Sequence, residues 1–175
     1  MSSWGVKATE SDYGLDLLVI IEKNHLEKNG FSYFDINETV QLLKKHIITD
    51  IINCNRGCDE EDMNIYIEDA FPYRYDIVIQ LIAEFFYEYI TDGKWVVTDY
   101  NDKDSDKVIK QFNYTKDDLK NLINDLRKLL HSDSELFQVW RDSDSFFEWK
   151  LHITALINCL NNHHCEILLA QEVDQ

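Results

Sequence analysis

Residues 76–90 read DIVIQLIAEFFYEYI, and this stretch decides the fold. Most of its residues are large and apolar, and they fall on nearly every side of a helix. Such a helix is usually buried at the centre of a domain, because no face of it favours contact with water. We therefore predict that residues 76–90 form the central helix of the core. Pro72 suits the first turn of this helix, and Asp92-Gly93 suits its end.

Two helices are predicted before the central one. Ser11 or Asp12 can cap the first helix, which we expect to end near Asn29-Gly30. Asp35, followed by Glu38 three residues later, resembles a capping box at the start of the second helix. We expect that helix to end at residues 55–57. The acidic tetrad at residues 59–62 is expected to form a solvated loop or the first turn of a short element.

The C-terminal half of the chain predicts a hairpin and two further helices. Residues 95–100 and 108–114 are rich in β-formers, and the acidic stretch 101–106 would join them. Thr115 with Asp118 starts a helix, and residues 146–160 repeat its 3-4 apolar spacing in a last helix. The predicted fold is mainly α: a single-domain helical bundle of about five helices with one short β-hairpin, covering residues 1–175.

The composition predicts one soluble domain in the cytoplasm. The chain has 175 residues and is 45% hydrophobic, which is enough to build a core. Its longest uninterrupted apolar run, Leu17 to Ile21, is too short to cross a bilayer, and we recognise no secretory signal. The four cysteines, at positions 54, 58, 159 and 165, are interpreted as reduced thiols of an intracellular protein.

Negative charge is the dominant feature of the sequence, and it is unevenly distributed. The formal net charge is −16, and residues 59–106 carry 14 acidic and 3 basic groups, a net of −11. Nucleic acids and anionic membranes are disfavoured as partners, because their phosphates would be repelled. A basic protein partner is favoured. The alternative is that the charge serves solubility alone.

Motifs for metal binding and catalysis are incomplete in this sequence. Asp102, Asp104 and Asp106 alternate like the first ligands of an EF-hand loop, but Lys107 and Asn113 replace its Gly and Glu. The pair Cys54 and Cys58, together with Cys159 and His163, could in principle hold zinc, although the spacing is not that of a zinc knuckle. No nucleophile elbow, phosphate loop or HExxH motif occurs. We therefore predict no catalytic residue, no metal site and no cofactor.

A protein-binding face is the favoured interpretation of residues 59–106. This segment holds 10 of the 22 aromatic residues as well as most of the net charge. Aromatic side chains anchor protein interfaces, and carboxylates around them steer and orient a basic partner. The alternative is that the aromatics are core and the acids only a solvated surface. The predicted partner-binding residues are Asp59, Glu60, Glu61, Asp62, Tyr66, Tyr73, Tyr75, Asp99, Tyr100, Asp102, Asp104 and Asp106.

Two resemblances bear on this interpretation. Ser3-Trp4-Gly5 and the later run from Ser11 to Asp16 resemble the start of an uncharacterised bacterial domain family with a Trp-Gly opening. This resemblance implies a structural signature, with Trp4 docked on the core, and assigns no active site. The small, acidic, motif-free chain is also similar in style to immunity proteins of bacterial polymorphic toxin systems. That likeness implies a co-encoded toxin as partner, often a basic nuclease whose active site the immunity protein covers.

The sequence thus favours a non-enzymatic acidic protein-binding domain, with an immunity-type inhibitor of a basic, nuclease-like toxin as its most concrete form. One alternative is a metal-dependent hydrolase that uses the cysteine and histidine groups. Another is a homo-oligomeric scaffold, for which the all-round apolar stretch 76–90 is the only indication.

Overall fold

The computed structural model describes residues 5–97 and 106–173, with side chains to residue 167. Within these residues the fold is mainly helical, with one small antiparallel hairpin and one short parallel strand pair, which confirms the predicted fold class. The α-helices are α1 (Asp12–Ile21), α2 (Ile36–Cys54), α3 (Glu60–Asp92), α4 (Lys116–Leu129), α5 (Glu135–Arg141) and α6 (Phe146–Val173). A 3-10 turn, η1 (Ala8–Glu10), precedes α1, and a π-helical turn, η2 (Glu22–Leu26), follows it.

The predicted helix starts are confirmed where a local cap defines them. The Ser11 hydroxyl accepts a hydrogen bond from the Gly14 amide at the start of α1. Asp35 caps α2 in the same way through the Glu38 amide, and Thr115 forms a capping box at the start of α4. Each cap satisfies amide groups that a helix leaves without an intrahelical partner.

The predicted start of the central helix is wrong. α3 begins at Glu60, and Pro72 lies in its interior. The acidic tetrad is the cap and first turn of this helix: the Asp59 carboxylate accepts from the Asp62 amide, and three acids follow at the positive end of the helix dipole. Packing against α2 along this added length outweighs the local cost of the proline. The predicted end is confirmed, since Gly93 adopts a left-handed conformation with φ of 68°.

One helix, α5, was not expected from the sequence. Its seven residues are too few to show a helical period, although Ser134 caps it by accepting from the Phe137 amide. Leu136 and Trp140 fix α5 in place, because both side chains are buried in the core. Trp140 stacks on Trp149 of α6, with ring centroids 5.9 Å apart.

The centre of α3 is enclosed by the rest of the chain, as predicted. Every residue from Ile77 to Phe86 is buried, including the polar Gln80 and Glu84. Both oxygens of the Glu84 carboxylate accept a bifurcated hydrogen bond from the Ala8 amide, at 2.9 and 3.0 Å. Its Oε1 atom also lies 2.8 Å from the His152 ring nitrogen Nε2. These contacts join η1 and α6 to the central helix.

The strands form two separate pairs beside this core. β2 (Trp95–Val97) pairs antiparallel with β3 (Lys107–Ile109), so the predicted hairpin is confirmed. The end of the second predicted strand behaves differently: β4 (Phe112–Asn113) pairs parallel with β1 (Phe34–Asp35). Aromatic packing explains why β4 pairs with β1. The centroid of the Phe34 ring lies 4.8 Å from that of Phe112 and 5.3 Å from that of Trp95.

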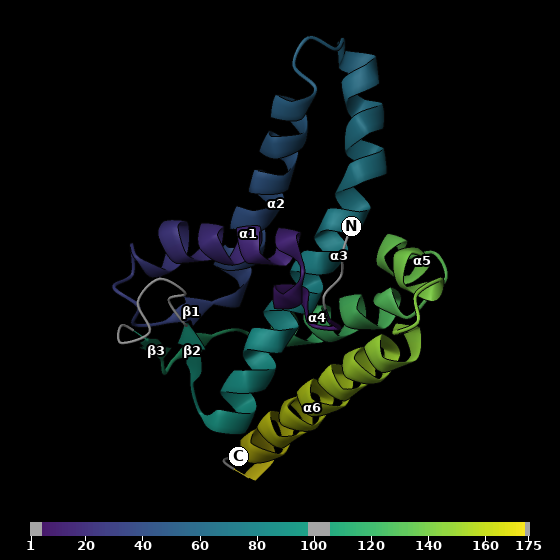
Figure 1. Ribbon diagram of the computed structural model, residues 1–175. Helices are drawn as coiled ribbons and strands as arrows, with labels where there is room; N and C mark the ends of the chain where they lie inside the picture. The colour runs from purple at the N-terminus through teal and green to yellow at the C-terminus, as the bar shows by residue number, and fades with distance from the viewer. Residues whose placement is uncertain (1–4, 98–105, 174–175) are drawn as a thin grey trace.

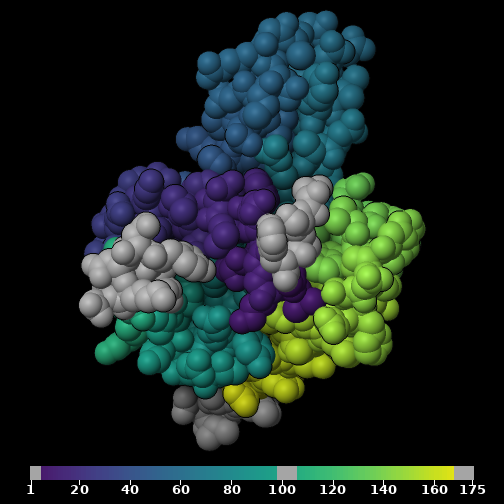
Figure 2. Space-filling model, in the orientation of Figure 1, coloured from purple at the N-terminus to yellow at the C-terminus, as the bar shows by residue number. Residues whose placement is uncertain are grey.

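An arm projects from the body of the molecule. It is the outer part of the α2–α3 hairpin, which we define as residues 47–74, and it extends beyond α1 and α5 (Figure 1). The space-filling view shows the same segment as a separate projection from the body (Figure 2). Because a projecting helical hairpin exposes both of its helices to solvent, the arm is a candidate binding surface.

Candidate functional site

The arm is held together by the inner faces of its two helices. Ile47 and Ile51 of α2 are buried, and Ile67 and Phe71 of α3 pack against the same core. Arg74, one turn beyond Phe71, forms an ion pair with Asp50 of α2. Residues 67, 71 and 74 share one side of α3. The ion pair between Arg74 and Asp50 shows that this side of α3 faces α2.

The opposite side of α3 is exposed and carries what we call the acidic face. Ile65 and Tyr66 are 51% and 44% exposed. Asp62 and Asp69 lie one turn before and one turn after them, at the helical spacing that brings side chains together. Glu61 and Glu68 stand beside Ile65 at the same spacing. The acidic face therefore consists of Glu61, Asp62, Ile65, Tyr66, Glu68 and Asp69, all exposed.

The acidic face has no internal compensation of its charge. Residues 59–69 contain six carboxylates and no lysine or arginine. The next cation along α3 is Arg74, which is already paired with Asp50 on the inner side. The first-turn acids are compatible with the helix because its positive dipole end lies beneath them. The result is two exposed apolar side chains surrounded by negative charge.

The structure brings together only part of the predicted binding face. Asp59, Glu60, Glu61, Asp62 and Tyr66 all lie on the outer part of the arm, within the cap and first two turns of α3. Asp106, by contrast, directly precedes β3, which pairs with β2. Trp95 of β2 packs on Phe34, and Phe34 lies just before the start of α2. Asp106 and the tetrad therefore lie near opposite ends of α2, a helix about 28 Å long. The predicted residues Asp99, Tyr100, Asp102 and Asp104 lie outside the described residues.

Tyr73 and Tyr75 occupy two different environments at the foot of the arm. The Tyr75 hydroxyl donates to Asp125 of α4 at 3.3 Å, and the Lys44 ammonium lies 4.7 Å from the centre of its ring. Burial and the Asp125 carboxylate raise the pKa of Tyr75. Tyr73 lies on the side of α3 that faces α5, where burial raises its pKa. Tyr75 is thus packed against α4, whereas Tyr73 is half-buried on the side of α3 that lines the groove beside α5.

Three residues of the acidic face were missed by the sequence prediction: Ile65, Glu68 and Asp69. The missed signal is the helical spacing from Asp62 to Asp69, which becomes visible once a helix is started at the Asp59 cap. Placing the start of the helix at Pro72 hid this pattern. The error in one helix boundary therefore concealed half of the surface.

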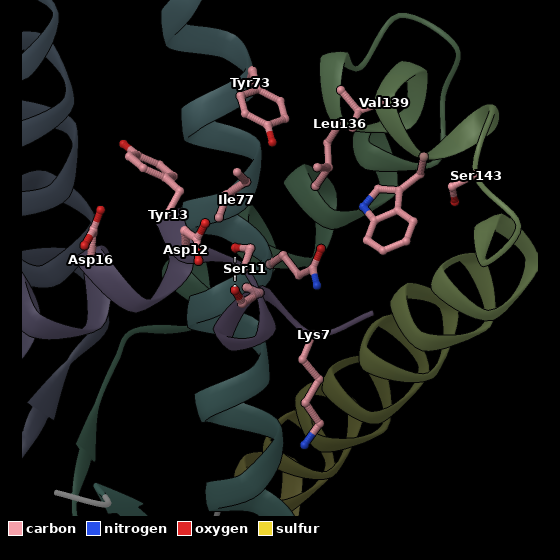
Figure 3. Close-up of a pocket in the computed structure, with 13 residues that line it drawn as sticks. Lys7, Ser11, Asp12, Tyr13, Asp16, Tyr73, Ile77, Leu136, Val139 and Ser143 are labelled. Atoms are coloured by element: carbon pink, nitrogen blue, oxygen red, sulfur yellow. Dashed lines mark hydrogen bonds between the residues drawn. The ribbon is translucent and has the colours of Figure 1, made fainter. Parts of the chain in front are cut away.

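A groove of about 520 Å³ lies at the foot of the arm, between α1, α3 and α5. Its floor is apolar, formed by Ile77, Leu136 and Trp140, and Val139 lies at its exposed rim. Tyr73, Asp12 and Ser11 border it, as Figure 3 shows. No single segment of the sequence could predict this groove, because α1 and α5 are more than 100 residues apart.

The tyrosine next to the groove, Tyr13, already binds a guanidinium. The Arg74 guanidinium carbon lies 5.5 Å from the centre of the Tyr13 ring. Burial raises the pKa of Tyr13 to about 12, although the charge of Arg74 acts against this shift. The Tyr13 hydroxyl therefore stays protonated at neutral pH, and its ring serves as a packing surface for the cation.

The residues of the zinc alternative are not brought together. Cys54 and Cys58 are exposed at the outer end of the arm, whereas Cys159 and His163 lie on α6. His163 is engaged elsewhere, with its Nε2 atom 2.7 Å from the Tyr114 hydroxyl. Among the described residues, no group of three or more His, Cys, Asp or Glu side chains is arranged to hold a metal ion.

The buried Glu84 and His152 pair is the arrangement most similar to an acid–base site. Glu84 is engaged with three other groups of the chain, the Ala8 amide, the Gln80 amide group and the His152 ring. Gln80 in turn accepts from the Trp149 indole N–H and donates to the Val6 carbonyl. A network in which each member binds another part of the chain anchors the fold.

One property of the helices and three comparisons with known proteins complete the description of the site. In the part of the chain that the structure describes, no helix is long and apolar enough to span a membrane. No protein-family model, curated protein or solved structure matches this chain.

Proposed function

We propose that this chain is a protein-binding domain that engages a basic protein through the acidic face of its arm. The observation that carries the proposal is the pairing of Ile65 and Tyr66, both about half exposed, with four surrounding carboxylates on a projecting helix. Exposed apolar side chains of this kind supply the desolvated centre of an interface. The carboxylates supply orientation and accelerate the encounter with a positively charged partner.

The most concrete form of this function is an immunity-type inhibitor of a basic, nuclease-like toxin. An arm that extends beyond the body can enter a concave active site, where a carboxylate row would take the place of substrate phosphates. Inhibition would be steric and electrostatic, with no chemistry performed by this chain. The resemblance in style to immunity proteins supports this form of the proposal.

The two alternative functions have less support from the described residues. The apolar stretch that suggested a homo-oligomeric scaffold is enclosed by the chain itself, because residues 77–86 are buried within one molecule. The metal-dependent hydrolase would need Cys54 and Cys58 beside Cys159 and His163, and these two pairs lie on separate parts of the fold.

Site-specific photo-cross-linking in the native host tests the proposal. Benzoylphenylalanine replaces Tyr66 on the acidic face and, as a matched control, Tyr87, an exposed tyrosine near the other end of the same helix. We expect the Tyr66 position to capture one protein with a pI above about 9, and the Tyr87 position not to capture it. Capture of an acidic protein, equal capture at both positions, or no capture at Tyr66 would contradict the proposal.

A further inference from the structure

The acidic face leads directly into the groove at the foot of the arm. Tyr73 follows Tyr66 by seven residues, which is two helical turns and about 10 Å along α3. Seven residues bring a side chain back to nearly the same side of a helix, and Ile77 continues this line into the groove floor. A partner that lies along the acidic face is therefore directed towards the side of the groove that Tyr73 and Ile77 line.

The groove combines an apolar floor with a negative border. Ile77 and Leu136 are each 4% exposed and Trp140 is 8% exposed, so the floor is firmly held in the core. Asp12 and Asp16 border the groove from α1. Asp12 is exposed and forms no hydrogen bond or ion pair with any other described residue.

The cation that lines the groove does not neutralise this border. Lys7 is the one lysine or arginine among the described residues that line it, and its side chain extends away from Tyr73 and Asp12 towards α6 (Figure 3). The other residues that line the groove include two carboxylates, two tyrosines and an apolar floor of aliphatic and indole side chains. This combination suits a ligand with an aliphatic stem and a flat cationic end.

The chain itself shows how such surroundings hold a guanidinium. At the border of the groove, which Tyr13 lines, Arg74 lies over the Tyr13 ring and is paired with the Asp50 carboxylate. The groove offers the same two groups, a tyrosine ring and a carboxylate, in Tyr73 and Asp12. It adds an apolar floor, along which the methylene stem of an arginine would pack.

We propose that the groove receives an arginine side chain of the basic partner, with its guanidinium between Asp12 and Tyr73 and its stem on Ile77 and Leu136. This inference rests on the proposed function, since it names the partner residue that the arm brings into position. An arginine fits better than a lysine, because its planar group both stacks on a ring and pairs with a carboxylate.

A pair of blocked pentapeptides tests the groove without the whole partner. One is acetyl-Ala-Ala-Arg-Ala-Ala-amide, and the other carries citrulline, which has nearly the shape of arginine but no charge. Binding is followed through the indole N–H resonance of Trp140 in the groove floor. We expect the arginine peptide to shift this resonance saturably and to bind at least about tenfold more tightly than the citrulline peptide.

Two variants test whether Asp12 contributes to binding of the arginine peptide. Asp12→Asn keeps the size of an exposed side chain in the first turn of α1, and we expect it to weaken the arginine peptide about fivefold or more. Asp117→Asn makes the same change in the first turn of α4, away from the groove, and should leave binding unchanged. Circular dichroism of both variants verifies that they fold.

The outcomes separate this inference from the proposed function. Neutralising Glu61, Asp62 and Glu68 of the acidic face should slow association of the basic partner while leaving the pentapeptide affinity unchanged. Equal binding of the arginine and citrulline peptides, or no effect of Asp12→Asn, would show that the groove does not bind arginine. Neither result would contradict binding of a basic protein by the acidic face. Peptide binding only after removal of residues 1–4 would also overturn the proposed arginine groove, because the chain's own N-terminus would then compete for the groove.

Discussion

Arg74 of α3 forms an ion pair with Asp50 of α2, across the two helices of the arm. Both side chains are partly exposed, so the pair contributes no more than about 1 kcal/mol to stability. Its larger consequence concerns charge: the first cation that follows six carboxylates on α3 is engaged on the inner side of the arm. The acidic face therefore keeps its full negative charge while the two helices remain joined.

The proline inside α3 should limit the stability of the arm. Pro72 is exposed, so replacing it removes little packing, and an alanine amide could donate to the carbonyl one turn earlier. We expect Pro72→Ala to raise the free energy of unfolding of the arm by about 1–3 kcal/mol. Amide hydrogen exchange of residues 60–71 measures this directly. Unchanged or faster exchange would show that the proline is accommodated without cost.

The buried carboxylate of Glu84 should be essential to the anchoring of the N-terminal segment. Glu84→Gln keeps the size of the side chain but removes the charge and one of the two oxygens that accept from the Ala8 amide. We expect a loss of about 2–3 kcal/mol in the free energy of unfolding, measured by urea denaturation. Glu88→Gln is the control one turn later. Its pKa is raised mainly by desolvation, so neutralising it should cost little. Equal effects of the two substitutions would contradict the role given to the network.

His25 should make the fold less stable in mild acid. Its side chain is buried, and its Nε2 atom accepts a hydrogen bond from the Asp35 amide at 3.2 Å, which requires the neutral ring. Burial lowers its pKa below the ordinary value of 6.5, although Glu38 and Asp35 oppose this. Between the folded pKa and 6.5, the unfolded chain therefore binds a proton at His25 that the folded chain does not bind. The stabilisation is complete above pH 6.5 and is lost as the pH falls towards the folded pKa.

The variant His25→Gln isolates this effect, because glutamine retains an acceptor and does not titrate in this range. The difference in unfolding free energy between the natural chain and the variant should shrink from about pH 8 to about pH 5.5. Urea denaturation at four or five pH values gives this difference. If this difference in unfolding free energy stays constant or increases at acidic pH, the role given to His25 is wrong.

Local signals explain most of what the sequence could predict. The caps at Ser11, Asp35 and Thr115 lie within four residues of the amides they bind, so each helix start can be recognised from a short stretch. The central helix was recognisable for a similar reason, because its apolar side chains are contiguous. Trp95 and Ile109 pair as the predicted hairpin requires, although they are 14 residues apart.

Tertiary contacts explain what the sequence could not predict. Pro72 has a local preference for a helix start, but the packing of Ile67 and Phe71 against the core continues the helix through it. The groove depends on Asp12, Tyr73 and Leu136, which three separate helices bring together. Gly14 is a further case: a Cβ atom there would lie 1.9 Å from the Ala8 carbonyl oxygen, a contact that only the fold creates.

The association rate of the basic protein captured at Tyr66, measured by stopped flow over a range of salt concentrations, tests the central claim most directly. The test variant carries Glu61→Gln, Asp62→Asn and Glu68→Gln, three of the four carboxylates of the acidic face, and leaves the Asp59 cap intact. The control carries Asp117→Asn, Asp133→Asn and Glu148→Gln, three exposed acids away from the arm, with the same change in net charge. We predict that the test variant associates about tenfold more slowly at low salt and loses most of its salt dependence, while the control resembles the natural chain. If both variants associate at the same rate and with the same salt dependence, the acidic face is not the binding surface.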